Sequence, residues 1–245
     1  ALAGLLIAMI GTHNVLWIDA ATFALSAALV AGVVPRDKPR SAAAGRYLDE
    51  LRAGGRYLRE HPMLLWLIGT FATLNLLLDP IFAVVLPVYA EQEFGSAVRL
   101  GLMVATFGAG TVAGVVAFGV VGPKLPRRPT LLTAIVLAGL PLWPIALTDA
   151  YPVILVALFV MGASIGPISP LVMTILHERV PAELRGRVFG AMTAIASGTV
   201  PLGIVIVGFT IEGVGLRSTL VVLAVAYLAM AATAFVNPAF RQLEK

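Results

Sequence analysis

Long apolar runs, separated by short polar breaks, recur along the whole chain. An α-helix rises about 1.5 Å per residue, so roughly 20 apolar residues cross the ~30 Å hydrocarbon core of a bilayer. The pattern therefore predicts an all-α fold, a polytopic membrane helical bundle with seven full spans and one partial span. The full spans are expected at 15–34, 62–88, 99–122, 130–148, 152–176, 188–211 and 217–238, and the partial one at 1–11.

The composition agrees with a protein whose surface faces lipid. Hydrophobic residues make up 59% of the 245-residue chain and charged residues only 12%, whereas soluble domains carry about 25% charged residues. With so few charges, a soluble domain of this length could not cover its surface with polar groups.

No pattern of chemical groups points to an enzyme. The chain has no cysteine, which excludes disulfides and thiolate metal sites, and the other residues show no metal-ligand spacing. It carries neither a glycine-rich phosphate loop with Lys and Ser or Thr nor a nucleophile paired with a base. We therefore expect no metal and no cofactor, and we do not expect an ATP-driven pump. Any activity of the protein that requires energy must then be driven by an ion gradient.

Basic residues lie almost entirely on one side of the predicted helices. If the helices alternate in direction, one side holds every Lys and Arg except Arg99 and Arg217. Cytoplasmic loops carry such an excess, so we expect that side to face the cytoplasm of a multi-pass membrane protein. Its segments are 35–61, 123–129, 177–187 and 239–245. Because the cations flank the membrane in short loops, we expect anionic lipid and not nucleic acid as their partner.

One loop is long enough to separate two helix bundles. We expect residues 1–34 to be the end of an N-terminal bundle, 35–61 a cytoplasmic linker with an amphipathic helix, and 62–245 a six-helix bundle with a short cytoplasmic tail. Because the chain opens at Ala1 inside an apolar run, we expect further N-terminal helices to precede it.

Glycine is concentrated in two predicted spans, 99–122 and 188–211. Small residues let helices approach closely in lipid. Two interpretations stay open, namely ordinary close packing of membrane helices and a sliding interface between two moving bundles.

Two acids lie inside predicted spans, Asp19 and Asp79. A charge at the bilayer centre costs about 2.5–3.5 kcal/mol on insertion scales, so such a residue usually has a reason. Asp79 follows Asn75 by one turn on the same helix face, and Pro80 predicts a kinked or partly unwound segment beyond it. We expect Asp79, with Asn75, to bind a proton or a cationic group. The alternatives are a carboxylate that caps the kinked backbone or one that pairs with a group outside this chain. For Asp19 we expect only a hydrogen bond near a helix N-terminus.

A run of glycine and proline interrupts the predicted span 152–176. Each proline removes a backbone donor and weakens the helical ladder, so we expect a break there. It could act as a flexing gate or be a plain kink for packing. The residues concerned are Gly162, Gly166, Pro167 and Pro170.

Four stretches resemble the major facilitator superfamily, within it the bacterial drug- and siderophore-exporter-like group. Val15–Phe23 is similar to its D-A-x-[ST]-F pattern, and Leu51–Pro62 to its G-x-R-[YF]-[LV]-x-x-[HN]-P segment. Val180–Val188 is similar to the P-x-E-x-R-G-R-[VA] loop, and Gly119–Arg128 to a degenerate G-x-x-x-D-R-x-G-R-R loop in which Pro123 replaces the Asp.

The resemblance implies two six-helix halves with a small-molecule substrate held between them near the midplane. This chain would run from the end of the fifth helix through the twelfth, and the halves would rock about the substrate. Asp79 and Asn75 would face the pathway, and the glycine-proline run would gate it. At the cytoplasmic side, one group of residues would either form contacts between the two halves or anchor the helix ends at the membrane surface. These residues are Arg127, Arg128, Glu183, Arg185 and Arg187.

The function that these observations favour is a proton-coupled exporter of small amphipathic molecules in the bacterial cytoplasmic membrane, working by alternating access. The expected partners are the substrate, the proton gradient, membrane lipid and the N-terminal helix bundle. An uptake carrier for a sugar or metabolite is the alternative within transport. A non-transporting membrane scaffold or regulatory protein is the alternative of another class.

Overall fold

The computed structural model of the chain describes residues 2–33, 52 and 54–244. These residues belong to two separate units, Ala1–Tyr47 and Leu48–Lys245, and each is described by itself. The division falls inside the segment 35–61 that the sequence predicts as a linker. Most of the amphipathic helix expected there lies outside the described residues, although residues 54–60 are helical.

The first unit contains one long helix with a single irregular residue. Helix α1 (Leu2–Val33) keeps helical geometry except at Gly11, whose φ of 78° lies in the region that favours glycine. The predicted polar break begins at this residue. Beyond it, Asn14 Nδ2 donates to the carbonyl of Ile10 at 2.8 Å. All side chains from Leu16 to Val33 are exposed within the unit, so this helix has an apolar surface on every side.

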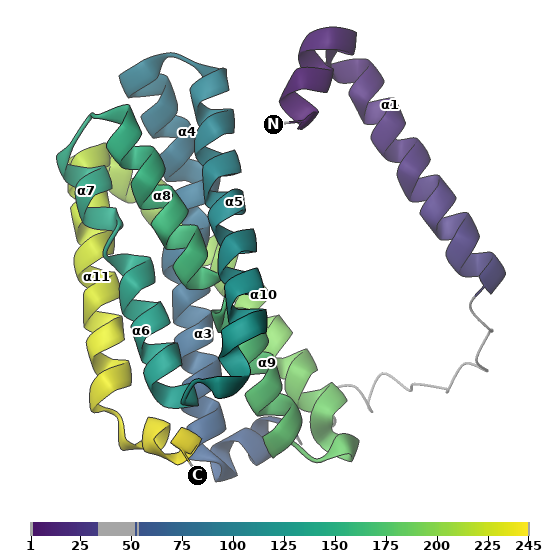
Figure 1. Ribbon diagram of the computed structural model, residues 1–245, viewed down its shortest axis with the longest axis vertical. Helices are drawn as coiled ribbons and strands as arrows, with labels where there is room; N and C mark the ends of the chain where they lie inside the picture. Colours follow the sequence, from purple (N-terminus) through teal and green to yellow (C-terminus); the bar gives the residue numbers. More distant parts are fainter. Residues whose placement is uncertain (1, 34–51, 53, 245) are drawn as a thin grey trace. The chain divides into compact units, whose positions relative to one another are not determined.

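The second unit is a bundle of six helical rods, each long enough to cross a bilayer (Figure 1). With residues 13–33 of α1, the described residues contain seven spans of sufficient length and hydropathy, which confirms the number predicted from the apolar runs. The rods extend past several predicted limits because polar residues at the ends continue the helices. Their bounds are Pro62–Phe94, Ala97–Lys124, Arg127–Leu147, Tyr151–Arg179, Ala182–Val214 and Leu216–Val236.

The first rod stays helical past its internal proline but changes its pitch. Helix α3 (Pro62–Pro80) leads directly into the π-helical segment η1 (Ile81–Val85), then α4 (Leu86–Tyr89) and a second π-helical segment η2 (Ala90–Phe94). A π-helix widens the hydrogen-bond ladder by one residue. The rod is therefore distorted beyond Asp79, as expected, but by widening and not by unwinding.

The second rod is helix α5 (Ala97–Val121), which ends in the short 3₁₀ turn η3 (Gly122–Lys124). The side chain of Ser96 caps its beginning by accepting a hydrogen bond from the backbone N–H of Arg99 at 3.4 Å. The turn η3 places Lys124 at the start of the loop to the third rod.

The third and fourth rods are each broken in the middle. The third consists of α6 (Arg127–Gly139) and α7 (Leu142–Leu147), and the fourth of α8 (Tyr151–Ile165) and α9 (Ile168–Arg179). The break between α8 and α9 falls at Gly166 and Pro167, which confirms the interruption predicted from the glycine-proline run.

The last two rods are continuous helices. Helix α10 (Ala182–Val214) keeps Pro201 in its interior, and Gly215, with a φ of 84°, turns the chain into α11 (Leu216–Val236). The described part of the chain ends in the 3₁₀ segment η4 (Pro238–Glu244).

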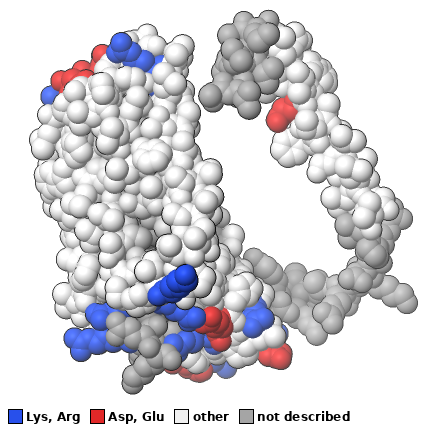
Figure 2. All heavy atoms as spheres, in the orientation of Figure 1, with Lys and Arg blue, Asp and Glu red and all other residues white. Residues whose placement is uncertain are grey.

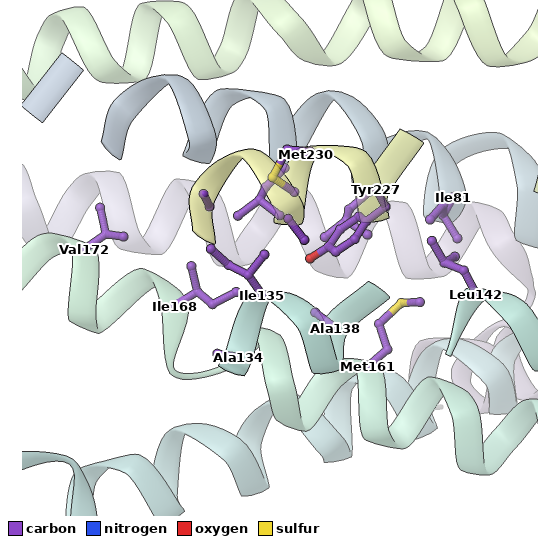
Figure 3. Packing of buried hydrophobic residues seen from close by; sticks show 14 of the residues in the cluster. Ile81, Ala134, Ile135, Ala138, Leu142, Met161, Ile168, Val172, Tyr227 and Met230 are labelled. Atoms are coloured by element: carbon purple, nitrogen blue, oxygen red, sulfur yellow. The ribbon is translucent and has the colours of Figure 1, made fainter. Parts of the chain in front are cut away.

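The core of the second unit draws on all six rods, and one part of it lies where α11 packs on α6 and α7 of the third rod. Figure 3 shows Tyr227 and Met230 of α11 beside Ile135 and Ala138 of α6, with Met161 of α8 near by. All five are buried. A side chain at Gly139 of α6 would collide with the ring of Tyr227, so this glycine makes room for a buried aromatic residue.

Polar contacts tie the rods together at the end opposite the basic loops. Arg217 at the start of α11 pairs with Asp149 before α8 and lies 3.7 Å from Glu93 of η2. The hydroxyl of Tyr89 donates to the carbonyl of Thr148 at 2.9 Å. On the face of this unit seen in Figure 2, charged residues gather at the two ends and the middle carries none.

Candidate functional site

The predicted pair Asn75 and Asp79 lies near the end of α3, directly before the π-helical segment η1. Both residues are half-buried in the second unit. Within the part of the chain that the structure describes, the carboxylate of Asp79 makes no hydrogen bond or ion pair. It does not cap the distorted backbone there, so that alternative finds no support. A partner outside the described residues stays a prediction.

Helix α10 packs on the side of α3 next to this pair. A side chain at Gly203 would collide with the carbonyl of Leu76 and approach Pro80 Cγ to 2.8 Å. About one turn earlier on α10, the hydroxyl of Thr199 lies 3.4 Å from the carbonyl of Ala72. The face of Ala72, Leu76 and Pro80 is thus covered by α10, and the neighbouring face with Asp79 is only half covered.

Two aromatic side chains lie beyond the acid on the same rod and its neighbour. Phe82 of η1 packs against Phe107 of α5, with ring centroids 4.2 Å apart. Phe82 follows Asp79 by three residues and is the second residue of the π-helical segment η1, so the aromatic pair lies close to the acid along the rod. The candidate site therefore combines an amide, a carboxylate and an aromatic pair, of which sequence reasoning found only the first two.

The predicted gate glycines lie in a close helix–helix interface. Side chains at Gly162 of α8 and at Gly166, directly after its end, would meet the carbonyls of Phe107 and Thr111 on α5, the second at 2.6 Å. From the other side, side chains at Gly110 and Gly114 would collide with the backbone of α8. Two pairs of glycines spaced by four residues therefore let the backbones of α5 and α8 touch. This observation supports the packing interpretation for these four glycines.

Six other glycines of the two glycine-rich predicted spans, three on α5 and three on α10, have open space beside them. Nothing lies within 4 Å of a side chain built at Gly101, Gly108 or Gly119 of α5. The same holds for Gly190, Gly198 and Gly208 of α10. Small residues with open space beside them are consistent with a further interface, so the sliding-interface interpretation stays open for these glycines.

Pro167 and Pro170 lie at the start of α9, where the fourth rod is broken. Pro167 is the residue before the first turn of α9, and the carbonyl of Pro170 accepts a hydrogen bond from Thr174 Oγ1 at 2.8 Å. Their placement at a break fits a gate, but the movement itself stays a prediction.

The predicted cytoplasmic contact residues make their described contacts inside the six-helix unit. Arg127 at the start of α6 forms a two-point ion pair with Glu178 at the end of α9, and Arg127 Nη2 lies 2.8 Å from Glu178 Oε1. Arg185 of α10 donates from Nε to the carbonyl of Val180 at 3.1 Å and from Nη2 to that of His177 at 2.8 Å. Contacts of these residues with another bundle stay predictions.

The remaining three residues of this predicted set are placed around the same end. Arg128 and Arg187 are half-buried, and Glu183 is exposed in the first turn of α10. A side chain at Gly54 would approach the carbonyl of Arg187 to 3.1 Å, so the helical residues 54–60 pack on the start of α10. No group of three or more His, Cys, Asp or Glu residues that could hold a metal occurs among the described residues.

Comparison with known proteins settles the family. The family model described as Major Facilitator Superfamily matches residues 68–244, which is most of the six-helix unit. The chain belongs to the major facilitator superfamily. This family consists of membrane transporters, and the apolar helices of the chain fit a multi-pass integral protein of a bacterial membrane.

The most informative relatives are named as drug exporters. The multidrug efflux pump Tap of Mycobacterium tuberculosis strain H37Rv is 31% identical over 247 residues, which is 100% of this chain and 59% of the relative. The pump of the same name from Mycolicibacterium fortuitum is 29% identical over 248 residues, 99% of this chain and 60% of the relative. An uncharacterized MFS-type transporter of Bacillus subtilis, YvqJ, is 26% identical over 172 residues, 70% of this chain and 40% of the relative. The chain thus spans about three fifths of the length of the curated relatives that it matches over its whole length.

Proposed function

We propose that the transporter containing this chain is a secondary active exporter that exchanges protons for small amphipathic molecules. The observation that carries this proposal is the carboxylate of Asp79, half-buried on a spanning helix and unpaired among the described residues. An ionised group at membrane depth is costly unless it is neutralised or paired. A proton in one state of the cycle and a cationic substrate in the other would each remove that cost.

The surroundings of Asp79 support a ligand that is both cationic and apolar. Phe82, three residues after Asp79, packs against Phe107, and aromatic faces attract cations as well as apolar groups. Asn75 adds an amide that can donate and accept hydrogen bonds. The names of the mycobacterial relatives, multidrug efflux pumps, support export as the direction.

Movement of the site between the two sides of the membrane would require a bundle that can flex. The break at Gly166 and Pro167 divides the fourth rod into two helices, and each half could tilt separately. Because α8 is fixed to α5 by close glycine contacts, we expect α9 to move relative to an α5–α8 pair that stays together. The basic end of the unit, held by Arg127 and Glu178, would then shift with α9.

Ethidium, a lipophilic cationic dye, provides a direct test in everted membrane vesicles with the full-length transporter. When respiration acidifies the vesicle lumen, a proton-coupled exporter should accumulate the dye inside, and collapse of the pH gradient should release it. We expect Asp79→Asn to abolish the gradient-driven accumulation. Asp19→Asn, which removes the other acid inside a span predicted from the sequence, is the matched control and should retain it.

The possible outcomes separate the competing functions. Accumulation that survives collapse of the gradient would argue against proton coupling, and accumulation that survives Asp79→Asn would remove Asp79 from the mechanism. Transport only in the inward direction of the intact cell would favour an uptake carrier. Full-length protein that moves no dye and no metabolite under any gradient would favour a scaffold.

A further inference from the structure

A groove runs along the outside of the six-helix unit between α6 and α8. Its volume is about 570 Å³. A second hollow of about 370 Å³ lies beside it towards α5 and shares four of its lining residues. The shared residues are Leu125, Thr130, Ala163 and Pro167. The two hollows therefore form one continuous surface feature that reaches the break between α8 and α9.

The length of the groove matches one leaflet of a bilayer. On α6 it is lined from Pro129 to Leu137, and on α8 and the break from Phe159 to Pro167. Eight residues of helix correspond to about 12 Å, and half of the ~30 Å hydrocarbon core is about 15 Å. The α6 wall begins at Pro129, close to the basic end of the unit, whereas the α8 wall ends at Pro167, twelve residues before Arg179, and so lies nearer the middle of the membrane.

The walls of the groove suit a hydrocarbon chain and not a polar solute. Most lining side chains are apolar, and two of the three lining hydroxyls donate to backbone carbonyls of the groove's own helices, while Thr133 is exposed in the groove wall. Thr130 Oγ1 donates to the carbonyl of Pro126 at 2.7 Å, and Ser164 Oγ to that of Val160 at 2.7 Å. These hydroxyls already have acceptors, so a polar molecule would lose its hydrogen bonds to water with little in return.

The mouth of the groove is positively charged. Leu125 and Pro126, which line it, lie between Lys124 and the doublet Arg127 and Arg128. The segment 122–137 contains no acid. Arg127 is paired with Glu178, whereas Lys124 is exposed. Figure 2 shows basic residues gathered at this end of the unit. The charge at the mouth is complementary to an anionic headgroup at the depth where headgroups lie.

We propose that this groove binds one anionic phospholipid, with an acyl chain along α6 and α8 and its headgroup phosphate at Lys124 and Arg128. A phospholipid fits all three observations, since it combines a chain of leaflet length with an anion at the end where the cations are. The bound chain would touch Pro167, so occupancy would also stiffen the break between α8 and α9.

Native mass spectrometry of the full-length transporter, titrated with phosphatidylglycerol or phosphatidylcholine, tests this proposal. We expect the anionic lipid to bind more tightly. A basic residue near the headgroups contributes about fivefold in affinity. Lys124→Gln should therefore weaken phosphatidylglycerol binding about fivefold and, together with Arg128→Gln, about 25-fold, with little change for phosphatidylcholine. Arg241→Gln, which removes an exposed charge at the same end, is the matched control and should have no such effect.

A second pair of variants tests the groove itself. Thr133→Phe projects from an exposed position of α6 into the groove and should weaken binding of both lipids. Leu140→Phe, at an exposed position just past the end of α6 and outside the groove, should not. Equal affinity for the two lipids, or lipid binding indifferent to both Lys124→Gln and Thr133→Phe, would overturn the proposal. So would a change of oligomer mass on Thr133→Phe without a change in lipid binding, because a second copy would then be the occupant.

Discussion

Gly114 provides the sharpest test of how α5 and α8 are held together. A side-chain carbon added there would collide with the carbonyl of Ala163 and lie 2.8 Å from its carbonyl carbon and 2.9 Å from its Cα. These atoms belong to the backbone of α8, so no side-chain rotation relieves the contact and the two helices must separate. Gly108 lies on the same helix with nothing within 4 Å of such a carbon, so Gly108→Ala is the matched control for Gly114→Ala.

The two substitutions share one favourable effect and differ in one unfavourable effect. Alanine is better than glycine inside a helix by about 1 kcal/mol, and both variants gain it. Overpacking of a tight interface costs about 1–3 kcal/mol, and only Gly114→Ala has this cost. We therefore expect Gly108→Ala to stabilise the protein by up to about 1 kcal/mol and Gly114→Ala to fall about 1–3 kcal/mol below it.

Thermal unfolding of the purified full-length protein, followed by far-UV circular dichroism at one scan rate, measures this difference. At about 2–4 °C per kcal/mol for a unit of this size, the Tm of Gly114→Ala should be lower than that of Gly108→Ala by roughly 2–12 °C. Gly114→Leu should enlarge the gap. Equal Tm values for Gly114→Ala and Gly108→Ala would refute the inference that the backbones of α5 and α8 are in contact at this position.

Three further predictions concern the core, the basic end and the break. The hydroxyl of Tyr227 is buried without a hydrogen-bond partner among the described residues. Tyr227→Phe should therefore stabilise the protein by about 1 kcal/mol and raise its Tm by about 2–4 °C. A lower Tm for this variant would contradict the prediction. Arg127 and Glu178 are partly exposed. A double-mutant cycle of Arg127→Gln and Glu178→Gln should therefore give a coupling free energy of unfolding of only about 0.2–1 kcal/mol, and this coupling should decrease in high salt. A coupling that is independent of salt would contradict an exposed pair. Pro167→Ala restores a backbone donor at the break. If the break is a gate, ethidium turnover should slow about fivefold or more, a barrier rise of about 1 kcal/mol, and the affinity for ethidium should change less. A larger change in affinity than in turnover would favour a plain kink.

The features that the sequence predicted well depend on local properties of the chain. Span number follows from the length of apolar runs, and the break at Gly166 and Pro167 follows from a missing backbone donor. Neither requires knowledge of which helices touch. The exposed apolar side chains of α1 and of the six-helix unit agree with this local pattern.

The features that it missed depend on tertiary approach. Arg127 and Glu178 are 51 residues apart, and their pairing requires α6 and α9 to end side by side. The four glycines of the α5–α8 interface could not be distinguished from Gly108 by spacing alone, because only the crossing of the helices selects them. Likewise, Pro80 predicted a distortion, but the choice of a π-helical segment over an unwound one depends on the packing around Ile81–Val85.

Proton release on substrate binding tests the central claim most directly. The purified full-length transporter is placed in weakly buffered detergent solution with a pH-sensitive dye, and ethidium is added. If Asp79 exchanges a proton for a cationic substrate, the wild type and Asp19→Asn should release about one proton per ethidium bound, and Asp79→Asn should release none. Equal proton release from Asp79→Asn, or ethidium binding to the wild type without any proton release, would contradict the exchange of proton and substrate at this carboxylate.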